Sequence, residues 1–160
     1  PFSVITFFHP DLQKSIASET SLPEIKKYIL TLFVSKNMFY AIKIDGTFSY
    51  VKIRSVPAQS KPYPTLDEAV KNQSVFEFHD IRGTLVGFWF PEDMKNMAVP
   101  NYHFHFISRD KKRGGHLLDC TIKDAMLEIS NKTEFNLRLP MTKYFREINT
   151  SSKSEGLAEK

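Results

Sequence analysis

The chain has 160 residues, of which 41% are apolar and 25% charged, the balance of one ordinary globular unit with a sizeable core. Its net charge of +4 is mild, and it carries neither an RNP-like motif nor a long basic stripe, which argues against nucleic acid as a partner. No apolar run approaches the ~20 residues of a membrane span, and a single cysteine, Cys120, excludes an internal disulfide framework.

The first two predicted elements are a strand and a helix. Residues 2–8 read FSVITFF, whose β-branched and aromatic side chains predict a strand that ends before Pro10. Ser21 and Glu24 have the spacing of a capping box, and apolar residues then recur at helical intervals, which predicts an amphipathic helix over 22–35. This helix offers an apolar face for packing and no residues that suggest chemistry.

Two hairpins are predicted in the middle of the chain. The dipeptide Asp45-Gly46 is a strong hairpin signal and is expected to join strands over 38–44 and 48–56. A second hairpin is expected from strands over 75–79 and 84–90, since a short run ending in glycine separates them. Both hairpins favour an antiparallel sheet.

The segments that flank the second hairpin are predicted to be mostly irregular. The prolines of residues 57–64 predict an extended loop. A second capping box begins at Thr65 and predicts a short helix to about Asn72. Residues 91–100 are expected to be irregular, with a helical turn over 92–96.

The stretch over 100–119 reads PNYHFHFISRDKKRGGHLLD and holds three of the five histidines. His103 and His105 are two residues apart, so in a strand both point to one face. The polar run that follows predicts a hairpin loop, and a returning strand would bring His116 beside them. Three converging imidazoles form an open metal site with a position for water or substrate. Histidines that merely hydrogen-bond to neighbours are the alternative, and the spacing alone leaves both interpretations open.

The last third continues this pattern and ends in a tail. The return strand is expected to turn at 123–125, with a further strand over 135–139 and a helical turn over 144–148. The predicted fold class is therefore α+β, with mostly antiparallel sheets built from hairpins, one or two short helices, and the metal site on a C-terminal sheet. Residues 1–150 are expected to form a single unit, and 151–160 a polar, disordered tail.

Four runs, in one order, resemble the alpha-acetolactate decarboxylases of bacteria and archaea: PFSVITFF, VKIRSVPAQSKPYP, GTLVGF and VPNYHFHFISRDKKRGGHLLD. The resemblance extends from Pro1 to about Pro140. It implies a lyase of acetoin biosynthesis that converts 2-acetolactate, a 2-hydroxy-3-oxo acid, to acetoin and carbon dioxide with Zn²⁺. It also implies a homodimer in the cytoplasm, although a start other than Met leaves secretion open. The family has two sheet-containing lobes, of which this chain is expected to carry part of the first and all of the second.

The resemblance also assigns site residues. His103, His105 and His116 match the three zinc-binding histidines of the family. Arg54 matches an active-site arginine, and its planar fork suits carboxylate oxygens. Without the resemblance, Arg54 reads as a surface arginine at the end of a strand. Asp119 is not expected to be a ligand.

The family uses two glutamates as well. One belongs to a segment that precedes the start of this chain, so we expect it to be absent here. The other is matched by Glu159, with Glu155 second, and a solvated tail acid is the alternative interpretation. Because a positioned acid or base contributes about 10²–10⁴-fold to rate, we expect this chain alone to bind metal but to decarboxylate poorly.

Two alternatives from other classes remain. A cupin-like metal enzyme also begins its motif with His-x-His, but cupins usually add a glutamate where this chain has Arg109 and Asp110. A non-catalytic metal-binding fragment would need only the histidines. Measuring acetoin formation discriminates between these functions.

Overall fold

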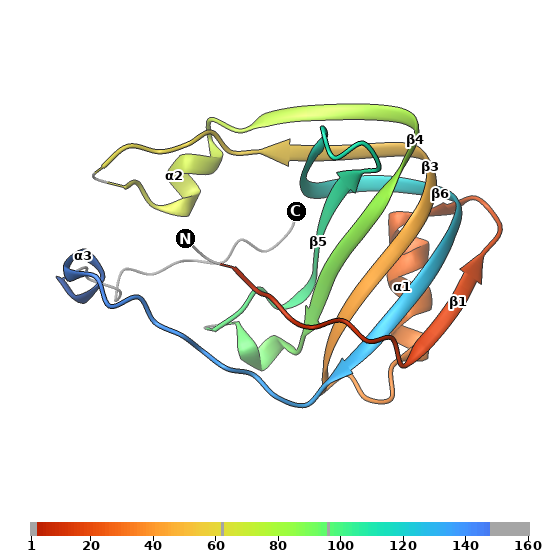
Figure 1. The fold of residues 1–160 in the computed structure, drawn as a ribbon, viewed down its shortest axis with the longest axis horizontal. Helices are drawn as coiled ribbons and strands as arrows, with labels where there is room; N and C mark the ends of the chain where they lie inside the picture. The colour runs from red at the N-terminus through yellow and green to blue at the C-terminus, as the bar shows by residue number, and fades with distance from the viewer. Residues whose placement is uncertain (1–2, 62, 96, 148–160) are drawn as a thin grey trace.

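The computed structural model describes residues 3–61, 63–95 and 97–147 (Figure 1). Its strands form one sheet in the order β1-β6-β3-β4-β5, and every pairing is antiparallel. The strands are β1 Leu12–Ile16, β2 Thr20–Ser21, β3 Phe39–Ser55, β4 Ser74–Phe90, β5 Asn101–Ser108 and β6 Gly114–Lys132. The helices are α1 Leu22–Leu32, α2 Leu66–Val70, the 3₁₀ turn η1 Glu92–Met94 and α3 Lys143–Glu147. The α+β class with mostly antiparallel sheet is confirmed.

The sheet closes on itself through its last two strands. β6 pairs with β3 on one side and with β5 on the other, so β6, β3, β4 and β5 form a ring. The closing contact is short: His105 pairs with His116, Phe106 with Gly115, and the last pair is Ile107 with Gly114. The histidine hairpin is therefore the seam of the ring.

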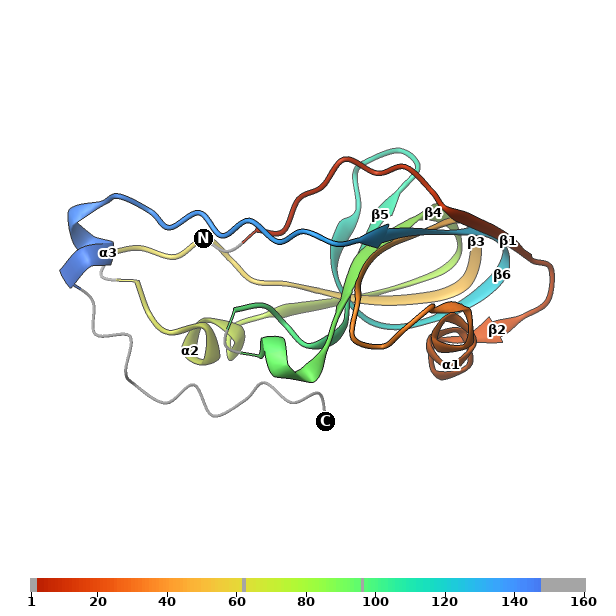
Figure 2. The same ribbon diagram turned by 90° about the horizontal axis from the view of Figure 1, so that it is seen from below.

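The inside of the ring is the hydrophobic core. Side chains alternate along each strand, so Ile42 and Ile44 of β3 and Phe104 of β5 are at least 96% buried. Helix α1 lies against the β6 and β3 side of the ring in both views and contributes Ile25 and Ile29, which are fully buried (Figures 1 and 2). The side chains in between point to the outer face, and the three histidines are among them.

The predicted hairpin at Asp45-Gly46 is wrong, because β3 runs straight through it. The glycine is needed for a close approach rather than for a turn. A Cβ on Gly46 would lie 2.5 Å from the Ala125 Cα and closer still to the Asp124 carbonyl oxygen. The backbone of β6 therefore passes directly over this position.

Two further predicted turns are wrong, because β4 and β6 also run through them. β4 is continuous from Ser74 to Phe90, with Asp80 in the left-handed region at a φ of 46° inside the strand. A Cβ on Gly83 would lie 2.5 Å from the Ile107 carbonyl oxygen. β6 continues through residues 123–125 and absorbs the irregularity in register shifts against β3. The sheet thus consists of a few long, bent strands rather than many short ones.

Two predicted strands do not form. Residues 3–10 and 135–139 are irregular, because among the described residues neither has a strand partner. β6, the neighbour of β1, ends at Lys132, and Pro10 has no N–H to extend a ladder. Residues 3–10 instead cross the outer face of the sheet, from beside β4 and β5 at Ser3 and Val4 to the start of β1 (Figure 1).

The helix predictions hold with shorter bounds. Both capping boxes are present, Ser21 with Glu24 at α1 and a second one at the start of α2. α1 ends at Leu32 rather than at residue 35, because Phe33 leaves the helix and stacks on Tyr40 with ring centroids 3.8 Å apart. η1 and α3 match the predicted helical turns. Residues 57–61 and 63–64 are irregular, as predicted. The predicted polar tail over 151–160 lies outside the described residues. No helix in the described ranges is long and apolar enough to cross a membrane.

Candidate metal centre

The seam of the ring is held by a five-residue turn, residues 109–113. The Ser108 hydroxyl donates to the Asp110 carboxylate and accepts from the Arg113 N–H at 3.1 Å. Arg113 also forms an ion pair with Asp110 at 3.2 Å. Asp110 is therefore engaged in the turn, which argues against the cupin-like alternative, where a carboxylate near this position binds the metal.

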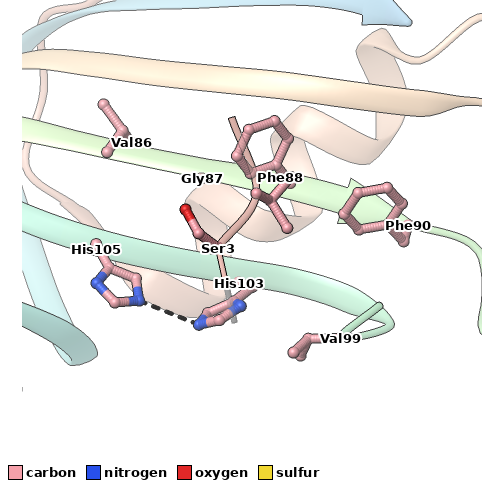
Figure 3. A pocket seen from close by; sticks show the side chains of 9 residues that line it. Ser3, Val86, Gly87, Phe88, Phe90, Val99, His103 and His105 are labelled. Atoms are coloured by element: carbon pink, nitrogen blue, oxygen red, sulfur yellow. Dashed lines mark hydrogen bonds between the residues drawn. The ribbon is translucent and has the colours of Figure 1, made fainter. Parts of the chain in front are cut away.

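The structure brings the three histidines together on the outer face. His105 is the direct partner of His116 across the seam, and His103 lies two residues earlier on the same face of β5. The Nε2 atom of His103 lies 3.1 Å from Nδ1 of His116 and 3.2 Å from Nε2 of His105. In Figure 3, the rings of His103 and His105 point toward each other below β5.

The donor set fits a tetrahedral metal ion. One nitrogen of each ring lies within 4.8 Å of the others, the one such group in the described part of the chain. Zn–N bonds of about 2.0–2.1 Å imply nitrogen atoms about 3.3 Å apart, close to both short contacts. Nε2 of His103 faces a ring nitrogen of each of the other two histidines. The lone pairs of three neutral imidazoles can therefore converge on one cation.

The electrostatics favour neutral rings, the form that binds metal. Burial, and then the charge of Arg54, lower the pKa of His116 to about 3, with smaller contributions from the neighbouring histidines. The same two causes, burial first, lower the pKa of His105. Both lowered pKa values favour the neutral ring at pH 7.

Arg54 lies beside the cluster. It is the register partner of His116 on β3, so both side chains leave the sheet on the outer face. Its Nη1 donates to the Oε1 of Gln73 at 3.1 Å in a half-buried position. Glu159 and Glu155 lie outside the described residues.

Two other residues considered from the sequence have no part in the cluster. Asp119 does not belong to the three-histidine group, and its carboxylate accepts from the Cys120 backbone N–H at 2.8 Å. Cys120 is fully buried, and burial raises the pKa of its thiol to about 12. That thiol is a packing group rather than a nucleophile.

A cavity of about 330 Å³ opens beside His103 and His105. Val86 and Phe88 of β4 are the direct neighbours of His105 and His103, and their side chains form its apolar wall (Figure 3). Its remaining lining residues are Ser3, Val4, Gly87, Phe90 and Val99. From the sequence, the β4 residues are predicted only to form a strand, and the alternation in TLVGFWF is the signal that places Val86 and Phe88 on one face. No sequence pattern predicts that Gln73, Ser3 or Val4 lies near the candidate site.

Comparison with known proteins adds independent support. A family model described as alpha-acetolactate decarboxylase matches residues 1–152. The alpha-acetolactate decarboxylase of Bacillus licheniformis is 43% identical over 145 residues, which cover 91% of this chain and 57% of that protein. The alpha-acetolactate decarboxylase of Methanosarcina mazei is 47% identical over 133 residues, 82% of this chain and 46% of that protein.

A solved structure agrees with the sequence comparison. The crystal structure of acetolactate decarboxylase from Bacillus subtilis subspecies spizizenii superimposes with a TM-score of 0.88 at 44% identity. The match covers 90% of this chain and 62% of that one. The chain thus spans about half the length of the curated relatives that it matches.

Proposed function

Because the chain belongs to the alpha-acetolactate decarboxylase family, we propose that it converts 2-acetolactate to acetoin and carbon dioxide with Zn²⁺ bound by His103, His105 and His116. The observation that supports this proposal is the cluster of three imidazoles beside an apolar cavity. The ring nitrogens would hold the ion. When bound, zinc supplies a Lewis acid that stabilises negative charge on the substrate oxygens as carbon dioxide leaves.

The protein's own residues bind and orient the substrate. Arg54 shares the outer face with the histidines, and its fork of donors suits the anionic oxygens of a 2-hydroxy-3-oxo acid. Val86 and Phe88 offer an apolar surface to the methyl groups of the substrate and keep water from that side. Such positioning is a large part of catalysis when the reacting group must lose carbon dioxide in one orientation.

A proton must replace carbon dioxide on the substrate carbon. We assign its delivery to Glu159, with Glu155 second, on the resemblance of the tail to the family. A carboxylic acid is a suitable donor once the cavity excludes water. Both residues lie outside the described part of the structure.

The test combines metal analysis with an activity assay. The purified chain is expected to hold one zinc ion, and His103→Gln to lose it, whereas His79→Gln on the exposed face of β4 is expected to keep it. Acetoin formation from 2-acetolactate should stop after chelation and return with Zn²⁺. Zinc binding without any acetoin would instead favour a non-catalytic metal-binding protein.

We also propose a homodimer in the cytoplasm. Large apolar side chains support association, since Ile5, Phe7 and Met141 are at least 85% exposed. Light scattering on the purified chain tests the mass. The cytoplasmic location rests on the resemblance alone, and fractionation of the source cells tests it.

A further inference from the structure

The side chain of Arg54 is long and must be held in place to act on a substrate. A free arginine side chain carries about 2 kcal/mol of rotamer entropy, part of which is lost when its position is fixed. The contact that fixes Arg54 is the hydrogen bond from its Nη1 to Oε1 of Gln73 at 3.1 Å. A guanidinium has only donors, so the amide must turn its oxygen toward it.

We infer that Gln73 is a positioning residue that holds the guanidinium of Arg54 ready for the anionic substrate, an inference that rests on the proposed function. The partner is neutral, and no carboxylate of the described residues forms an ion pair with Arg54. A glutamate in its place would also orient the guanidinium, but it would neutralise the charge that an anion needs. An amide orients the arginine and leaves its charge available.

Gln73 is itself held from both sides. Its backbone N–H donates to the Val70 carbonyl at 3.0 Å, at the end of α2, and the next residue, Ser74, pairs with Ser55 at the end of β3. Helix α2 has five residues, too few to be stable as an isolated helix, and a capping box stabilises its first turn. Thr65 and Glu68 complete that box, and Ala69 is the buried residue of the helix.

This arrangement explains the connection between β3 and β4. It runs from residue 56 to residue 73, although the strand ends that it joins are already paired. Here the connection contains the short helix α2. Its last residue, Gln73, places its side-chain amide beside Arg54, which lies two residues before the connection begins.

The test uses Gln73→Met, which keeps the length of the side chain and removes the acceptor. Gln59→Met is the matched control on the same connection, since the Gln59 amide donates to the nearby Pro57 carbonyl at 2.7 Å, away from Arg54. Gln73→Met is expected to lower kcat/KM for 2-acetolactate by about 10–100-fold with unchanged zinc content, because small misplacements cost about 10²-fold. Gln73→Glu is expected to raise KM more than it lowers kcat.

A double-mutant cycle separates positioning from a merely structural role. In an Arg54→Ala background, Gln73→Met is expected to have no further effect, because it acts through the arginine. Additive losses would overturn the inference. If the wild-type protein forms no acetoin, the proposed function is refuted. In that case a crystal structure of Gln73→Met tests the positioning role of Gln73 without an activity assay. An ordered Arg54 in its original position would overturn it, and a guanidinium spread over several rotamers would support it.

Discussion

Arg54 and His116 lie opposite one another on β3 and β6, so a guanidinium and an imidazole leave the sheet side by side on one face. This pairing links the end of β3 to the hairpin of β5 and β6 that closes the ring. Positive charge thus lies within reach of the candidate metal ligands without a carboxylate from the described residues between them. An anionic ligand would meet a cation on both sides.

Arg54→Lys is expected to lower kcat/KM by at least about 10-fold. Lysine keeps the charge but is a point charge, so it cannot make two parallel hydrogen bonds to an anion. Zinc content is expected to stay at the wild-type level, since Arg54 is not one of the ligand residues. Steady-state kinetics and metal analysis measure the two effects. Arg82→Lys, at an exposed position of β4, is the control, and equal turnover in both variants would remove Arg54 from the mechanism.

Gly46→Ala is expected to destabilise the fold by at least about 2 kcal/mol, as overpacking of a tight position does. The new methyl group would lie 2.5 Å from the Ala125 Cα, so β3 and β6 would have to separate. Urea unfolding measures the difference. Gly114→Ala is the control, because its nearest neighbour would be 3.0 Å away and a smaller loss is expected. Equal stabilities of the two variants would contradict a close approach at Gly46.

That glycine also shows where sequence reasoning fails. Asp45-Gly46 has the local signature of a turn, but a glycine that admits a neighbouring strand looks the same in one sequence. The neighbour, Asp124, is distant in the chain, so no local pattern reports it. The false strand over residues 2–8 failed for a related reason, since strand propensity needs a partner that the described chain does not supply.

The candidate site was predictable where it is local. His103, His105 and His116 lie on one hairpin, and strand parity with a short loop is enough to bring their rings together. The hydrogen bond between Arg54 and Gln73 spans a long connection, and its existence depends on how α2 folds back. The apolar wall at Val86 and Phe88 depends on which strand lies beside β5. Such contacts follow from topology rather than from spacing.

Glu128→Gln is expected to lower stability in a pH-dependent way. Glu128 accepts from Lys43 Nζ at 2.6 Å and from Gln13 Nε2 at 2.8 Å, and the bond from Lys43 is the main cause of its lowered pKa. The folded pKa lies below the unfolded one, so the ionised carboxylate stabilises the fold above about pH 4.5, and this contribution is lost as pH falls through the folded pKa.

The expected loss at pH 7 is about 0.5–1 kcal/mol, since Lys43 is partly exposed to solvent. It should shrink toward zero as pH falls through the folded pKa of Glu128. Urea unfolding at several pH values, in a fixed metal state, measures it. Glu134→Gln, at an exposed position, is the control for the same substitution outside the Lys43–Glu128 ion pair. A difference that grows in acid would reverse the sign of this argument.

Val86→Phe is expected to narrow the cavity and to raise KM for 2-acetolactate. Val86 is the direct neighbour of His105 and lines the cavity of about 330 Å³, so a larger side chain would occupy space that we assign to the methyl groups of the substrate. One methylene in such a pocket is worth about 1–3 kcal/mol, so kcat/KM should fall by at least about 10-fold. Because Val86 is 46% exposed, the change should leave the stability of the fold nearly intact. Zinc content should not change, since the histidines keep their strand positions.

Val34→Phe, at a position 81% exposed, is the control for added bulk alone. A substrate that carries a larger alkyl group sharpens the test. Relative to wild type, Val86→Ala should raise kcat/KM for the larger substrate compared with kcat/KM for 2-acetolactate. If this ratio of kcat/KM values is unchanged in both Val86 variants, the substrate binds elsewhere on the outer face.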